Sequence, residues 1–236
     1  MSNESAGPGD SYAVEPAPQA VVPIAGSREL FPVHRIYCVG RNYAAHAQEM
    51  GGDPNREPPF FFQKNPDNLV LDGRFPYPSA SDNVQHEIEM VVALGKGGTD
   101  IPIEHALRSV FGYAAGLDMT RRDLQEQAKD MRRSWEMAKA FEASAPCGPL
   151  RPASVIGHPS AGAITLEVNG TLKQVGDLAQ MIWKVPEIVS YLSGLFALRP
   201  GDLIFTGTPA GVSAVKRGDL IRGHIDTIGD IEVRVV

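Results

Sequence analysis

The stretch Val84–Leu94, VQHEIEMVVAL, is the clearest strand in the sequence and carries two acidic side chains within an apolar run. The glycine-rich run 95–98, GKGG, ends it. Because side chains alternate along a strand, Glu87 and Glu89 are predicted to leave one face, and the apolar residues between and after them to line the other.

This carboxylate pair has two interpretations. The simpler is a solvent-facing strip of an antiparallel sheet, where charge is tolerated. In the other, both carboxylates are buried, where they would repel each other and be costly to desolvate. A bound divalent cation would remove that cost, so the pair indicates a candidate metal site.

Outward from this stretch, strands outnumber helices. Further strands are predicted over 35–39, 60–63, 110–117, 164–168, 172–175, 203–206, 220–225 and 231–236, and short helices over 43–50, 101–108, 120–129 and 186–192. Asn169-Gly170 predicts a tight hairpin turn. Asp100 and Thr120 are the expected helix caps, and Gly194 is expected just past the last helix. The similar runs 199–204, RPGDLI, and 216–221, KRGDLI, predict a repeated turn.

Composition supports a β-rich globular chain. The 236 residues include 24 Gly and 19 Pro, roughly 18% against an average near 12%. The net charge of −6 argues against a nucleic-acid surface, and no apolar run reaches the roughly 18 residues of a membrane span. Residues 1–20 are predicted to be a flexible tail and 21–236 one catalytic domain. Without a signal-like N-terminus, and with Cys38 and Cys147 interpreted as reduced thiols, a cytoplasmic location is expected.

Asp118 follows a predicted strand and precedes a predicted helix. It could simply help to cap that helix, but Asp118, Arg122 and Gln125 have the spacing of one helical face. A carboxylate, a guanidinium and an amide would then point into one site. Together with the glutamate pair, Asp118 would give three carboxylate oxygens, which fit Mg²⁺, with Mn²⁺ or Ca²⁺ as alternatives.

His46 and Glu49 are neighbours on the predicted helix 43–50. A carboxylate beside an imidazole orients the ring and raises its basicity, as activation of water requires. A surface pair is the simpler alternative. Lys64 and Lys139 are isolated basic candidates that could equally be solvated charges, and Tyr43 has the character of a core residue.

The run 206–212, TGTPAGV, is a glycine-rich turn after an apolar strand. It can present backbone N–H groups and hydroxyls to an anion, or it can be a tight turn only. It lacks the ending of a phosphate-binding P-loop.

Five of these segments in this order resemble the fumarylacetoacetate hydrolase family over about residues 21–236. The segments are 40–43 (GRNY) with His46 and Glu49, 86–89 (HEIE), 117–120 (LDMT) with Arg122 and Gln125, 138–141 (AKAF) and 206–212. The resemblance implies an α+β, β-rich fold, a mixed β-sandwich roll with a few short helices, and a homodimer.

The same resemblance implies roles for individual residues. Its metal ligands would be Glu87, Glu89 and Asp118. The catalytic residues would be His46 and Glu49, on a lid helix, with Lys139 stabilising developing negative charge. The candidates for substrate binding are Arg41, Tyr43, Lys64, Arg122, Gln125 and Thr208.

The implied activity is metal-dependent cleavage of the C–C bond of a 2,4-dioxo acid. Within the family, the run 56–64, REPPFFFQK, is most similar to bacterial fumarylpyruvate hydrolases of gentisate breakdown. Decarboxylation of oxaloacetate or isomerisation of a dioxo acid is the alternative. A catalytically silent module that binds metal or carboxylate is a third interpretation, against which the presence of both His46 and Glu49 argues.

Overall fold

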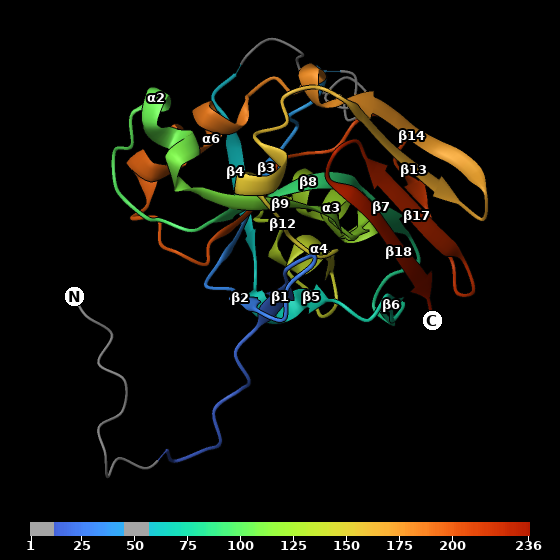
Figure 1. The fold of residues 1–236 in the computed structure, drawn as a ribbon. Coiled ribbons are helices and arrows are strands. Elements are labelled where there is room, and N and C mark those ends of the chain that lie inside the picture. Colours follow the sequence, from blue (N-terminus) through green and yellow to red (C-terminus); the bar gives the residue numbers. More distant parts are fainter. Residues whose placement is uncertain (1–11, 45–56) are drawn as a thin grey trace.

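The computed structural model describes residues 12–44 and 57–236. Two large sheets dominate these residues, as Figure 1 shows. The first has six strands in the order β12-β9-β8-β15-β3-β4. Its strands are β3 (Ile36–Gly40), β4 (Phe60–Lys64), β8 (Ile88–Leu94), β9 (Val110–Leu117), β12 (Arg151–Pro152) and β15 (Leu203–Phe205). Neighbouring strands are antiparallel except β15 and β3, which are parallel.

The second sheet has five strands in the order β14-β13-β17-β18-β6, and four of them appear in orange and red in Figure 1. They are β6 (Arg74–Phe75), β13 (Ala163–Val168), β14 (Thr171–Asp177), β17 (Leu220–Ile225) and β18 (Gly229–Val235). The Asn169-Gly170 turn joins β13 to β14 as predicted, with φ of 52° and 76°. Both central residues of such a turn need positive φ, which explains the Asn-Gly pair.

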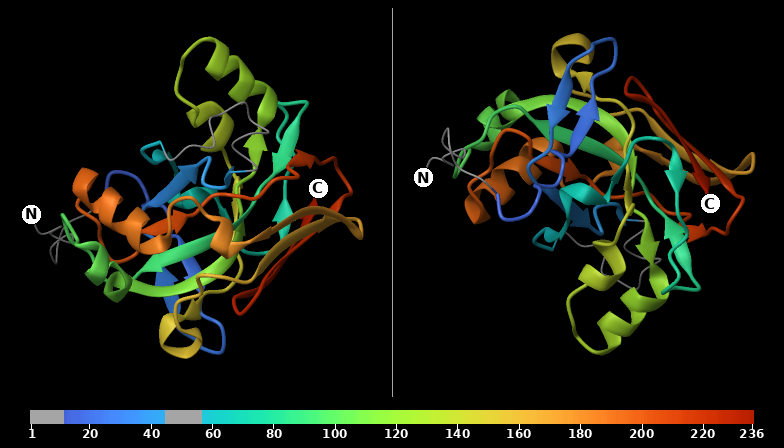
Figure 2. Two further views of the ribbon diagram at one scale, coloured as in Figure 1. Left: turned by 90° about the horizontal axis from the view of Figure 1, so that it is seen from above. Right: turned by 90° about the horizontal axis from the view of Figure 1, so that it is seen from below.

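Smaller sheets complete the β structure. A three-stranded sheet joins β10 (Thr120–Arg121), β7 (Val84–His86) and β16 (Ser213–Ala214), and two-stranded sheets join β1 (Val21–Pro23) with β2 (Leu30–Pro32) and β5 (Leu69–Val70) with β11 (Ala145–Pro146). Within residues 57–236 the helices are α2 (Ile103–Ala106), α3 (Arg122–Asp130), α4 (Glu136–Lys139), α5 (Ala153–Ile156) and α6 (Val185–Leu195), with single 3₁₀ turns at Pro66–Asn68, Leu107–Ser109 and Leu178–Gln180. Figure 2 shows α3 and α4 together at one side of the molecule, away from α6 and α2. The prediction of a β-rich α+β fold is confirmed.

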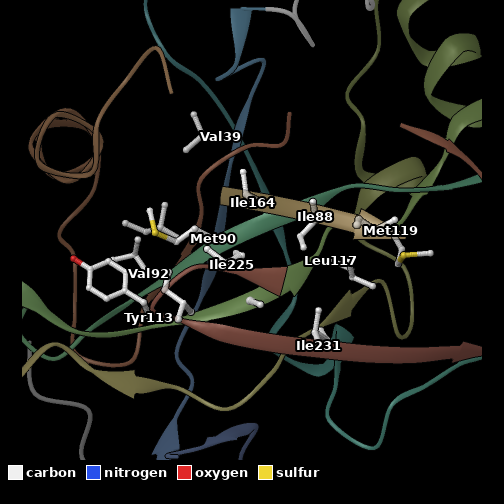
Figure 3. Packing of buried hydrophobic residues seen from close by; sticks show 14 of the residues in the cluster. Val39, Ile88, Met90, Val92, Tyr113, Leu117, Met119, Ile164, Ile225 and Ile231 are labelled. Atoms are coloured by element: carbon white, nitrogen blue, oxygen red, sulfur yellow. The ribbon is translucent and has the colours of Figure 1, made fainter. Parts of the chain in front are cut away.

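Strand β8 is buried on both of its faces. Ile88, Met90 and Val92 belong to the core cluster between the two large sheets, which includes Ile164 and Ile225, as Figure 3 shows. The intervening β8 residues 91 and 93 belong to a second cluster on the other face. The strand is therefore part of the interior, and its carboxylates are not a solvent-facing strip.

The single strand predicted over 84–94 is wrong in one respect, because it breaks at Glu87. The preceding part, β7, pairs with β10 and β16, whereas β8 pairs with β9 and β15. The partner strand breaks at the same level, where the Asp118 N–H donates to the Glu87 carbonyl at 2.8 Å. The β7–β8 and β9–β10 segments therefore pass side by side from the three-stranded sheet to the six-stranded sheet.

The helix predicted over 120–129 begins later than expected. Thr120 belongs to β10, where it pairs with Gln85, and helix α3 starts at Arg122 without a side-chain cap. Asp123, in the first turn of α3, accepts from Ser81 Oγ at 2.6 Å.

The other helix boundaries also differ from the prediction. Helix α2 begins at Ile103 after Pro102, so Asp100 is not its cap. Helix α6 continues through Gly194 to Leu195. The predicted helix 43–50 lies outside the described residues from position 45 onward.

The repeated turn at 199–204 and 216–221 is confirmed. In each copy the aspartate carboxylate, Asp202 or Asp219, accepts the backbone N–H three residues earlier at 2.8 Å. The glycine before each aspartate has φ of 94° and 91°. The two runs therefore share local turn chemistry.

Candidate metal centre

Three buried carboxylates meet where β8 begins and β9 ends. Glu87, Glu89 and Asp118 each offer an oxygen, and these oxygens all lie within 4.8 Å of one another. Glu87 precedes β8, Glu89 lies within it, and Asp118 directly follows β9. The pairing of Ile88 with Leu117 holds the two strand ends in register and brings the three side chains together. We call these three residues the carboxylate triad.

Positively charged groups surround two members of the triad. Lys139 Nζ lies 2.9 Å from Glu87 Oε2 and 2.6 Å from Asp118 Oδ2. Arg122 Nη2 lies 2.5 Å from Glu87 Oε1, and Lys64 Nζ lies 2.8 Å from Asp118 Oδ1. Burial opposes charge on Lys139, but the carboxylates of Asp118 and Glu87 outweigh that effect and raise the pKa of its ammonium.

Glu89 has a different environment. Its Oε2 accepts the Gly207 N–H at 2.7 Å, and within residues 12–44 and 57–236 no cationic side chain forms an ion pair with it. Burial, followed by the nearby charges of Asp118 and Glu87, raises the pKa of Glu89 well above its usual value. Gly207 has φ of 95°, and a Cβ there would lie 2.7 Å from the Cβ of Asn42, so this position requires glycine.

The triad fits a divalent cation. Carboxylate oxygens are the ligands that hard cations prefer. Glu89 lacks an ion-pair partner within the described residues, and Asp118 Oδ1 is buried there without a directed hydrogen bond, although Lys64 Nζ is close. A cation between the three side chains would supply the missing charge.

Four of the predicted substrate-binding residues line the cavity beside the triad: Arg41, Arg122, Gln125 and Thr208. Arg122 and Gln125 project from the first turn of α3, and Arg122 Nη1 donates to Gln125 Oε1 at 2.5 Å. Lys139, at the end of α4, lines the same cavity. The structure therefore brings the charged candidates to one place, although Asp118 precedes the helix rather than extending its face.

The remaining candidates have other surroundings. Tyr43 is buried in the core cluster between the large sheets, and burial raises the pKa of its hydroxyl. Lys64 is buried behind Asp118, where its ammonium also donates to the Lys139 and Met119 carbonyls. His46 and Glu49 lie outside the described residues.

Sequence reasoning missed the aromatic wall of a second cavity. This cavity has a volume of about 580 Å³ and shares Arg41 and Trp135 with the first. Phe60 and Trp183 also line it. Phe60 begins β4, and Trp135 and Trp183 lie in connecting segments, so their spacing in the sequence does not distinguish a cavity wall from a core.

Comparison with known proteins places the chain among enzymes. Residues 35–236 match the family model described as fumarylacetoacetate (FAA) hydrolase C-terminal.

The chain belongs to the fumarylacetoacetate hydrolase family.

A fumarylpyruvate hydrolase from Ralstonia sp is 44% identical over 184 residues, which is 78% of this chain and 95% of the relative. A mitochondrial oxaloacetate tautomerase from Mus musculus is 40% identical and covers 85% of this chain and 90% of its own length. The crystal structure of fumarylpyruvate hydrolase from Pseudomonas aeruginosa in complex with Mn²⁺ and pyruvate has a TM-score of 0.94 and 55% identity, covering 96% of this chain and 99% of that one. Among the described residues, no helix combines the length and apolar character needed to cross a membrane.

Proposed function

We propose that the protein hydrolyses the C–C bond of an acylpyruvate, a 2,4-dioxo acid, using a divalent cation held by the carboxylate triad. The leading substrate is 3-fumarylpyruvate, cleaved to fumarate and pyruvate during breakdown of aromatic compounds such as gentisate. The observation that carries the proposal is a buried triad beside Lys139, Arg122 and Thr208 in one cavity. The relatives that act on fumarylpyruvate support the choice of substrate.

In this proposal each residue has a defined task. A divalent cation supplies Lewis acidity toward the substrate's oxygens when bound, and Mg²⁺ is the proposed ion. Thr208 binds the substrate carboxylate, and Arg122, Gln125 and Lys139 stabilise negative charge that develops on the pyruvate half.

The proposed water-activating pair is His46 and Glu49. His46, oriented by Glu49, takes a proton from water, whose oxygen attacks C4 of the substrate. The C3–C4 bond then breaks, and C3 of the pyruvate half gains a proton. Each cleavage consumes one water and forms one fumarate and one pyruvate.

The second cavity favours an acylpyruvate over oxaloacetate. It opens beside Arg41 and Trp135 and has room for an acyl group beyond C4. Oxaloacetate ends at C4, which is itself a carboxylate, so it has no carbon to place in that cavity. Tautomerisation or decarboxylation of oxaloacetate is the second candidate, because relatives with the tautomerase activity are about as similar as the Ralstonia enzyme.

The decisive experiment compares three substrates with and without Mg²⁺ or Mn²⁺. Fumarylpyruvate should be consumed fastest, acetylpyruvate more slowly, and oxaloacetate least, and excess chelator should abolish turnover. Faster tautomerisation or CO₂ release from oxaloacetate would favour the second candidate. If chelator left the rate of fumarylpyruvate cleavage unchanged, the proposed use of a metal would be excluded.

The triad itself is tested by Glu89→Gln. The amide oxygen can still accept from Gly207, but the charge is lost, so Mn²⁺ affinity should fall by more than the roughly 10- to 100-fold typical of outer-shell changes. Glu104→Gln, at an exposed position on α2, is the matched control and should bind Mn²⁺ normally. Unchanged metal affinity in Glu89→Gln would remove Glu89 from the proposed ligands.

The assembly and location are also proposals. A cytoplasmic homodimer is expected, and light scattering during size-exclusion chromatography should give twice the mass of one chain. A mass of one chain at micromolar concentration would contradict this.

A further inference from the structure

Gln174 lies on β14, outside the proposed site, yet its side chain reaches the cavity wall. It is fully buried. Its Oε1 accepts the Ile88 N–H at 3.1 Å, and His86 Nδ1 lies 2.9 Å from the same oxygen. Its Nε2 donates to the Pro209 carbonyl and to Thr208 Oγ1, both at 2.8 Å.

The backbone fixes which way this amide points. The Ile88 N–H can only donate, so it must face the amide oxygen of Gln174. The Pro209 carbonyl can only accept, so it must face the amide nitrogen. The remaining N–H of that nitrogen therefore points at Thr208, whose oxygen has to accept it.

A hydroxyl whose oxygen accepts one hydrogen bond keeps its own hydrogen for another acceptor. Thr208 lines the cavity with the carboxylate triad, so that hydrogen is available to an anionic group bound there.

Close packing holds this arrangement in place. Gly211 has φ of 95°, and a Cβ there would lie 2.0 Å from the Lys173 carbonyl oxygen and 3.2 Å from Gln174 Cα. Only glycine lets the turn that carries Thr208 pack this tightly on β14.

We propose that Gln174 is a positioning residue that makes the Thr208 hydroxyl a fixed hydrogen-bond donor to the substrate carboxylate. The inference rests on the proposed function, because it needs a carboxylate bound at Thr208. It goes beyond that function by assigning the orientation of the donor to a side chain on the other large sheet. Pre-organisation of this kind lets the donor bind without reorientation.

The test is a double-mutant cycle that measures pyruvate affinity at saturating Mn²⁺. Gln174→Glu keeps the shape and the acceptor for Ile88, but it replaces the N–H donor with a second oxygen. The Thr208 hydroxyl must then turn to donate to that oxygen and is lost to the ligand. Thr208→Val removes the hydroxyl and keeps the shape.

Each single substitution should weaken pyruvate binding by roughly tenfold or more, the scale of one hydrogen bond to a charged group. The double variant should bind no more weakly than Thr208→Val alone, because Gln174 then has no hydroxyl to orient. Gln180→Glu, which adds the same charge at an exposed position near β14, should bind pyruvate like the wild type. In steady-state turnover, Gln174→Glu should raise KM for the dioxo acid.

Losses that multiply in the double variant would overturn the inference, as would normal pyruvate affinity in Gln174→Glu. If Gln174→Glu does not fold, Gln174→Met can replace it in the cycle. Methionine has no N–H to donate to Thr208, so the Thr208 hydroxyl is free to rotate but is not drawn toward residue 174. Wild-type protein that binds pyruvate while the cycle is additive overturns only the role of Gln174. Wild-type protein that binds no pyruvate and cleaves no fumarylpyruvate overturns the proposed function as well.

Discussion

Lys139 places one ammonium group between two carboxylates of the triad. This contact offsets repulsion between Glu87 and Asp118 and also puts a positive charge in the cavity wall. A lysine so placed can compensate the carboxylates in one state and stabilise substrate charge in another. The two effects can be separated by removing the charge while keeping the length of the side chain.

Lys139→Met should lower kcat by about 10²-fold or more, because one preorganised positive group is lost from the reacting centre. Mn²⁺ binding should survive, since no proposed ligand is changed. Steady-state kinetics and a metal titration measure the two quantities, and Lys96→Met, at an exposed position, is the control. An unchanged kcat would show that Lys139 only compensates charge.

At the scale of residues, the sequence could identify side chains whose chemistry is unusual for their setting. Glu89 within an apolar strand and Asp118 at a strand end are such cases, and the structure brings them together. Gln174 could not be identified, because a glutamine in a hairpin strand is ordinary until the turn at 206–212 packs on it. Trp135 and Trp183 could not be identified for the same reason, because only tertiary contacts place them in the wall of a cavity.

At the scale of elements, the sequence predicted those turns and strands that local residues decide. The Asn169-Gly170 turn and strand β9 follow the prediction. Turn chemistry decides the first, and a continuous apolar run, buried on both faces, decides the second. The start of α3 does not follow the prediction, because Thr120 finds a partner in Gln85, which lies far away in sequence. Long-range pairing of this kind overrides a capping pattern.

Two glycines provide a matched test of how conformation, rather than space, determines stability. Gly170 has φ of 76° and open space within 4 Å of the point where a Cβ would lie, whereas Gly194 lies inside α6 with its nearest contact at 3.8 Å. Gly170→Ala should lower the free energy of unfolding by about 1 kcal/mol because alanine is strained at positive φ. Gly194→Ala should raise it by about 0.5 kcal/mol because alanine favours the helix.

Urea unfolding followed by circular dichroism measures both glycine variants against the wild type. Equal effects of the same sign would contradict this account, because space alone allows a methyl group at either position.

At the scale of the whole molecule, both cysteines are sealed in the core on the far face of β8. Cys38 and Cys147 are free thiols that are buried. Burial raises the pKa of Cys147 to about 12 and the pKa of Cys38 well above its usual value. A thiol must be accessible and deprotonated to react, so only opening of the core would expose either one.

We therefore expect neither thiol to react quickly with an aromatic disulfide reagent at about pH 8, and both to react in urea. The raised pKa means that the thiolate fraction at this pH is small and grows only as the pH increases. Absorbance of the released thiolate reports the rate. A fast phase in the native protein would show that one of the two cysteines is reached without unfolding.

The seam between the six-stranded sheet and the small β7–β10–β16 sheet has a consequence for how such an enzyme can diversify. The carboxylate triad lies at the start of β8 and the end of β9, which are buried on both faces, so a substitution there disturbs the interior. The walls of the second cavity, by contrast, come from Arg41, Phe60, Trp135 and Trp183 at strand ends and connecting segments. Transplanting those wall residues between relatives should therefore exchange acyl-group preference while leaving the metal-binding chemistry unaltered.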